Sequence, residues 1–192
     1  MHSMNFSDGF NTVDEMVKFA GEIGLTEIAI TDHSDEWMLN LRAKYGLYPN
    51  SMRSQAKRWR NVHNDVQVIF WIEADLLDQQ GNICDTIHGK ESEFIILSAH
   101  KEVYKSDKNT INEAYENSII QHHKKITLIW HPCSNANFWE YVDIEKLVSL
   151  ANQYEIALEM NAKYLTHNQE NIEKLDYMLK NANKIYINSD AH

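Results

Sequence analysis

Residues 24–33 read GLTEIAITDH, and this stretch decides the fold. Its apolar letters IAI at 28–30 follow a turn-forming glycine and are typical of a short buried strand. Asp32 and His33 come directly after the apolar letters, and both side chains can bind a cation. The stretch therefore predicts a strand over about 27–31 that ends in metal-binding residues.

The same pattern recurs further along the chain. Apolar runs that end at residues 72, 97, 130 and 187 are each followed within five residues by a side chain that can bind a metal. These side chains are Glu73, His100, His131, Asp190 and His192. A ligand at the end of strand after strand indicates a metalloenzyme, with the ligands gathered at one rim.

Periodicity gives an alternating order of strands and helices along the whole chain. Repeated β-then-α units predict an α/β fold of parallel strands with right-handed crossovers, in one domain over residues 1–192. The capping box Thr12–Glu15 opens the first helix and Asp143 caps a later one. We expect strands at 27–31, 67–74, 93–98, 126–130, 156–160 and 184–188, and helices at 12–23, 51–63, 109–123, 143–154 and 168–183.

The composition limits the class of protein. At 192 residues with 43% hydrophobic content, the chain suits one globular domain with a substantial core. No apolar run approaches the roughly 20 residues of a membrane span, and the first residues show no signal segment. Cys84 and Cys133 belong to no close-spaced motif, so no disulfide scaffold is expected. A reducing cytoplasm is the default location.

Charge is unevenly distributed along the chain. A formal net charge of −10 argues against a general nucleic-acid binder, which needs a basic face. The stretch 42–60 nevertheless holds six cations and no carboxylate. It is either a solvated helix face or a positive lip that draws a phosphate-bearing substrate toward the ligands. Its cations are Arg42, Lys44, Arg53, Lys57, Arg58 and Arg60, of which we take Arg42, Arg53 and Arg58 as candidate substrate-binding residues.

Taken together, these motifs resemble the PHP family, named for polymerase and histidinol phosphatase, over essentially the whole chain. Each motif is short and weak alone, but an opening motif and six further motifs, each at a strand end, occur in the family's order. The motifs, in order, are His2-Ser3 with Ser7-Asp8-Gly9, Ile30-Thr31-Asp32-His33, Ile72-Glu73-Ala74-Asp75, Ser98-Ala99-His100, His131-Pro132, Glu159-Met160-Asn161 and Ser189-Asp190-Ala191-His192.

The resemblance implies a distorted (β/α)7 TIM-like barrel with two to three divalent metals at its carboxyl rim. Carried over, Glu73 would bridge two metals, one completed by His2 and Asp190 and the other by His100 and His131. A third metal would be held by Asp8, His33 and His192. The catalytic residues implied are Glu73, His131, Asp190 and His192. Five His and three carboxylates form a mixed N/O set, which suits zinc, manganese or iron.

The chain departs from the family pattern at its beginning. The first His of the opening motif would lie before Met1, and His2 aligns as the second with a small insertion; pairing Met4 instead would make His2 the first. The first strand and the last helix look truncated, so we expect a longer natural chain with a few residues before Met1 and a helix after His192. A chain that ended here would keep two open sheet edges, and we expect it to be less stable and to associate.

The expected activity is metal-dependent hydrolysis of a phosphate ester by an activated water, with a small phosphomonoester as substrate. Histidinol phosphate is one plausible substrate because members of the family hydrolyse it. Asp32 and Asn161 are candidates to orient ligands, and Trp37 and Tyr45 to line the substrate mouth. Two alternatives stay open: a nuclease or exonuclease of the same family, and a degenerate metal-binding module without catalysis.

Overall fold

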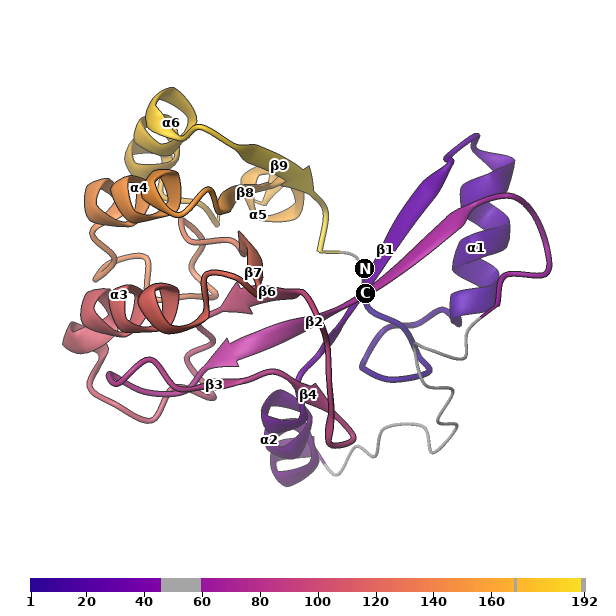
Figure 1. The fold of residues 1–192 in the computed structure, drawn as a ribbon, viewed down its shortest axis with the longest axis horizontal. Coiled ribbons are helices and arrows are strands. Elements are labelled where there is room, and N and C mark those ends of the chain that lie inside the picture. Colours follow the sequence, from indigo (N-terminus) through magenta and orange to yellow (C-terminus); the bar gives the residue numbers. More distant parts are fainter. Residues whose placement is uncertain (46–59, 168, 191–192) are drawn as a thin grey trace.

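The computed structural model describes residues 1–45, 60–167 and 169–190, without the side chains of 41–45. Its main sheet is a path of six parallel strands in the order β1-β2-β6-β7-β8-β9, curled into a half-barrel with helices between the strands (Figure 1). The predicted α/β class and its TIM-like parallel arrangement are confirmed. The strands are β1 (Glu27–His33), β2 (Gln67–Leu76), β6 (Ile95–Ser98), β7 (Ile126–Ile129), β8 (Ala157–Asn161) and β9 (Ile185–Asn188).

Two main helices begin where their capping residues predicted, and a third lies within its predicted range. Thr12 and Glu15 form both hydrogen bonds of the capping box at the start of α1 (Val13–Glu22). The Asp143 carboxylate accepts the Lys146 backbone N–H at the start of α4 (Ile144–Gln153). The helix α3 (Ile111–His122) follows the 3₁₀ turn η2 (Lys108–Thr110), and both fall within the predicted range.

Other elements differ from the predictions. The last helix, α6 (Ile172–Asn181), begins later than expected because Asn171 caps it. The helices α2 (Asp35–Tyr45) and α5 (Ala162–Thr166) were not predicted, nor were the two-residue strands β3 (Ile83–Cys84), β4 (Thr86–Ile87) and β5 (Lys90–Glu91). The helix predicted at 51–63 lies mostly outside the described residues, and its described end, 60–63, is irregular.

The core is divided by the sheet. The helices α3, α4 and α6 lie side by side over the outer face (Figure 1), where buried residues such as Leu97, Ile129 and Leu158 form the largest apolar cluster. A second cluster packs Val13 and Val17 of α1 against the first half of β1 and β2. These two clusters fix the strands, and the carboxyl ends of the strands are therefore held at one edge of the half-barrel.

The amino-terminal residues run beside β1. The Thr31 backbone N–H donates to the Met1 carbonyl over 2.9 Å, and the Ser3 backbone N–H donates to the Asp32 carboxylate over 2.5 Å. These contacts deliver His2 to the edge where the strands end. Within the described part of the chain, no helix combines the length and apolar character needed to cross a membrane.

Candidate metal centre

Neighbouring parallel strands place the first two candidate ligands together. His33, the last residue of β1, is the Cα partner of Glu73 in β2. Side chains at partnered positions of adjacent strands lie on the same face, so both point to the interior rim. Glu73 is fully buried and His33 is 3% exposed. The strand β6 then continues into His100, and β7 into His131, on the same rim.

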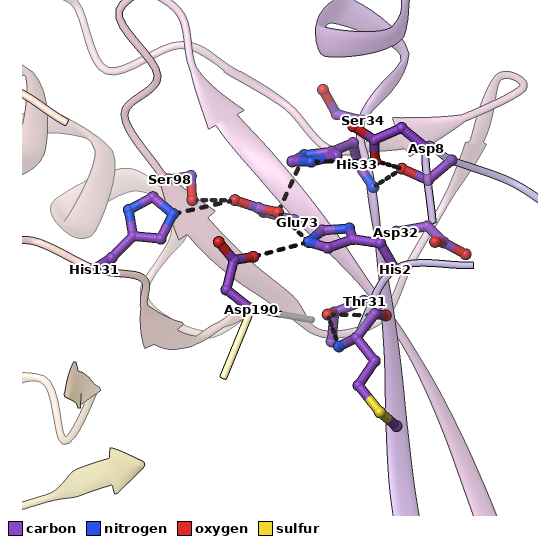
Figure 2. A network of polar contacts seen from close by, with 12 residues as sticks. His2, Asp8, Thr31, Asp32, His33, Ser34, Glu73, Ser98, His131 and Asp190 are labelled. Atoms are coloured by element: carbon purple, nitrogen blue, oxygen red, sulfur yellow. Dashed lines mark hydrogen bonds and ion pairs between the residues drawn. The ribbon is translucent and has the colours of Figure 1, made fainter. Parts of the chain in front are cut away.

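The Glu73 carboxylate is the centre of the cluster, and each of its oxygens faces two imidazoles. Oε2 lies 3.1 Å from His33 Nδ1 and 3.4 Å from His2 Nε2. Oε1 lies 3.2 Å from His100 Nε2 and 3.8 Å from His131 Nε2. Figure 2 shows Glu73 between His131 on one side and His2 and His33 on the other.

Two further carboxylates complete the cluster at its edges. Asp190 Oδ1 lies 3.1 Å from His2 Nε2, and Asp8 Oδ1 lies 3.7 Å from His33 Nε2 (Figure 2). The imidazoles of His2 and His33 are stacked, with their centroids 4.1 Å apart. The structure therefore brings His2 into the cluster, next to Glu73 and Asp190.

Two of the candidate ligands are held in a strained backbone conformation. His131 has a φ of 31° and Asp190 a φ of 49°, in the left-handed region that few residues other than glycine adopt. Such conformations persist only where the surrounding structure imposes them, and they are concentrated at functional sites. Asn137 contributes here, because its side-chain amide lies 3.3 Å from the carbonyls of both Trp130 and His131.

A layer of buried polar groups orients the cluster. His100 Nδ1 contacts Asp75 Oδ1 at 2.6 Å, which leaves Nε2 directed at Glu73. Carboxylates commonly orient metal-binding imidazoles in this way. The Ser98 hydroxyl donates to Glu73 over 2.5 Å, and the His131 backbone N–H donates to Glu159 over 2.8 Å.

Sequence reasoning missed the role of Asp75. The available signal was the two-residue period of a strand, since Asp75 and Glu73 lie on the same face of β2. Asp32, a predicted orienting residue, accepts two hydrogen bonds from Ser3 and so supports His2. Asn161, the other, donates to Glu159 over 3.3 Å and caps α5.

Burial and close charges shift the pKa values of the cluster. Burial lowers the pKa of His33 to about 3 and that of His131 to about 4, so both imidazoles are neutral at pH 7. Burial alone would raise the pKa of Glu73, but the imidazoles of His33, His100 and His2 outweigh it and hold the pKa well below its ordinary value. Burial likewise opposes a charged His100, but Glu73 and Asp75 raise its pKa well above its usual range.

The donor set fits divalent cations. Three groups have their donor atoms within 4.8 Å of one another: His2 with Asp8 and His33; His33 with Glu73 and His100; and His2 with Glu73 and Asp190. His131 lies outside these groups, next to Glu73. Among the described residues, Glu73 Oε2 and His131 Nδ1 are buried and neither makes a contact with hydrogen-bond geometry, although His33 Nδ1 and His2 Nε2 lie close to Oε2. Buried charges of this kind are stable when paired or when they coordinate metals.

The remaining candidate residues have no described side chains. His192, Arg53 and Arg58 lie outside the described residues, and so do the side chains of Arg42 and Tyr45. The third ligand set is therefore seen only as Asp8 and His33.

A cavity of about 140 Å³ opens beside the cluster. Trp37 packs on His100 with ring centroids 4.4 Å apart, and Tyr164 lies edge-on to His131 at 5.4 Å. Both aromatic side chains line the cavity, as predicted for Trp37. The full lining is His33, Trp37, His100, Glu102, Ala136, Tyr164 and Asp190.

This arrangement belongs to a known family. The PHP domain family matches residues 1–181, so the chain is a member of the PHP family. One relative is the DNA polymerase/3'-5' exonuclease PolX of Bacillus subtilis (strain 168), which is 27% identical over 202 residues, covering 100% of this chain and 33% of PolX. Another is a probable phosphatase of Serratia proteamaculans (strain 568), 27% identical over 175 residues, covering 90% of this chain and 66% of that protein.

Both relatives are longer, so this chain spans a third of the polymerase and just under two thirds of the phosphatase. A solved structure has the same fold: histidinol phosphate phosphatase of Lactococcus lactis subsp. lactis Il1403, complexed with zinc, L-histidinol and phosphate. Its TM-score is 0.55 at 14% identity, over 100% of this chain and 84% of that chain.

Proposed function

We propose that this chain hydrolyses phosphate esters with divalent transition metals, and that its substrate is a small phosphomonoester. The observation that carries the proposal is the Glu73 carboxylate, buried and facing four imidazoles at 3.1–3.8 Å beside an open cavity. The probable phosphatase among the relatives and the phosphate in the related zinc-bound structure support this choice of reaction.

Two to three zinc, manganese or iron ions would be held by the cluster. One ion would take His2, Glu73 and Asp190; a second Glu73, His100 and His131; a third Asp8, His33 and His192. Such ions supply Lewis acidity toward a phosphoryl oxygen and an activated water nucleophile. His192 is proposed from the family motif alone, since it lies outside the described residues.

The side chains of this protein prepare that chemistry in three ways. His33 and His131 have depressed pKa values, so they offer the neutral lone pairs that bind cations. Glu73 remains ionised, so its carboxylate would screen the repulsion between two bound cations. Asp75 holds His100 so that Nε2 is directed inward. The substrate phosphate would also meet the cations Arg42, Arg53 and Arg58, in keeping with the positive stretch 42–60.

The test is an assay of metal-loaded protein. Protein purified with manganese or zinc is expected to hydrolyse p-nitrophenyl phosphate, and His131→Ala is expected to lower kcat by roughly 100-fold or more, as for the loss of a group that acts on the transition state. His63→Ala, a surface change beside Asp14, serves as the matched control. The proposal fails if the metal-replete protein releases no product, or if His131→Ala has wild-type activity.

An exonuclease activity is the second candidate, favoured by the similarity of the whole chain to part of PolX. Higher kcat/KM on single-stranded DNA than on small phosphomonoesters would reverse the ranking. A metal-binding module without catalysis would contain one ion or none per chain, and elemental analysis separates it from both enzymes.

A further inference from the structure

Two neighbouring polar side chains, Lys163 and Tyr164, are presented at the rim next to the cluster. They belong to α5, which begins directly after β8, at the edge where the strands end. The buried Asn161 side chain accepts hydrogen bonds from the backbone N–H groups of both residues, over 3.0 and 3.3 Å. The first turn of α5 is thereby fixed to the end of β8, and both side chains are held near the candidate ligands.

Both side chains contact the same oxygen of Asp190. The Tyr164 hydroxyl donates to Asp190 Oδ2 over 3.3 Å, and Lys163 Nζ lies 3.6 Å from that oxygen. The other oxygen, Oδ1, faces His2. Asp190, at the edge of the cluster, therefore has a cation and a hydroxyl donor beside its outer oxygen, and an anion bound by these two groups would lie next to the cluster.

The carboxylates that line the cavity favour such a pair. Asp190 and Glu102 line the cavity, and Glu73 contacts two of its lining residues, His33 and His100, so a phosphate dianion meets several carboxylates on entry. Lys163 supplies a positive charge next to Asp190, which lines the cavity, and its side chain is 38% exposed. Tyr164 already lines the cavity, and its hydroxyl can donate to a phosphate oxygen.

We infer that Lys163 and Tyr164 form an anion-binding pair that seats the phosphate group of the substrate beside the metal cluster. The inference rests on the proposed hydrolysis of phosphate esters. It adds a phosphate-binding site made of residues that the structure describes. Lysine acts here as a point charge, a common role in phosphate sites, and the tyrosine hydroxyl supplies the directional hydrogen bond.

Binding of inorganic phosphate to the zinc-loaded protein, followed by isothermal titration calorimetry, tests the pair without turnover. Lys163→Met is expected to weaken phosphate binding roughly 10- to 100-fold, as for a hydrogen bond to a charged group, and Tyr164→Phe roughly 3- to 10-fold, as for an ordinary hydrogen bond. Lys163→Arg keeps most of the affinity because the charge remains. Lys180→Met, at an exposed lysine paired with Asp176, removes the same charge and should leave the affinity unchanged. For p-nitrophenyl phosphate, KM is expected to rise with the phosphate Kd, while kcat changes less.

The results that would overturn the inference are distinct from those that would overturn the function. Wild-type phosphate affinity in Lys163→Met, at full metal content, would show that the pair does not bind the anion. Loss of zinc in Lys163→Met would show that the lysine only positions Asp190. If the wild-type protein binds phosphate through Lys163 but hydrolyses no ester, the anion-binding pair stands and the proposed activity fails.

Discussion

Replacing Asp75 with Asn tests how the cluster is oriented. Asp75 is fully buried, its Oδ1 lies 2.6 Å from His100 Nδ1, and the Ser34 hydroxyl donates to its other oxygen. The Asn side chain has nearly the same shape and can keep both contacts, but it carries no charge. Only the charge-assisted part of the His100 contact is removed, so the change isolates the orienting effect.

The expected magnitude follows from that contact. A hydrogen bond to a charged group contributes about 1.5–3 kcal/mol, and loss of a carboxylate behind a ligating His weakens metal binding roughly 10- to 100-fold. These two figures agree, since about 1.4 kcal/mol is a factor of ten. We therefore expect Asp75→Asn to weaken binding at the ion that His100 contacts by one to two orders of magnitude.

The assay is a competition titration of zinc against a chromophoric chelator, with circular dichroism to verify folding. Asp78→Asn is the matched control, because Asp78 makes the same kind of polar contacts in an exposed turn, with Asn82. At saturating zinc the activity of Asp75→Asn should recover in large part. A folded Asp75→Asn protein that binds zinc as tightly as the wild type would refute the orienting role.

Three further predictions concern packing, pH and metal removal. A Cβ at Gly9 would lie 2.0 Å from the His2 carbonyl oxygen, so Gly9→Ala should lower stability by about 1–3 kcal/mol and weaken zinc binding. The control Gly24→Ala should lose stability without weakening zinc binding. Thermal unfolding and chelator titrations check this, and equal zinc affinities of the two variants would count against it. Burial raises the pKa of Glu170 to about 7, so its ionisation costs stability as pH rises from about 4.5 to 7. In urea unfolding, Glu170→Gln should raise the free energy of unfolding by about 1–2 kcal/mol at pH 8, after allowance for solvent screening, and leave it unchanged at pH 4. A gain in stability seen only at pH 4 would contradict this prediction. Chelation should lower Tm by roughly 5–10 °C, as for loss of ions present at about 100 times their Kd, and an unchanged Tm would contradict stabilising metals.

The strands could be predicted because an apolar run in the sequence marks each of them. The IAI run of β1 and the longer run of β2 are apolar and at least partly buried, and such runs show in composition alone. Their parallel order follows from the helices between them, and it places His33 opposite Glu73. The gathering of ligands at one rim therefore follows from the sequence once the strands are identified.

Other features depend on tertiary contacts that the sequence does not display. The helix α2 carries no strong apolar stripe, and its first residue, Asp35, is fixed by accepting hydrogen bonds from the distant His88 and Gly89 backbones. The short strands β3 to β5 are too brief for any period to show. Lys163 and Tyr164 occur in no recognisable motif, and only the position of α5 beside Asp190 reveals them.

The most direct test of the account is the metal content of the protein. After loading with zinc or manganese and removal of free ions, elemental analysis should find two to three ions per wild-type chain and at least one fewer in Glu73→Gln, since Glu73 faces four imidazoles. One ion or none in the wild type, or equal content in the two proteins, would contradict the claim that this carboxylate organises a cluster of divalent cations.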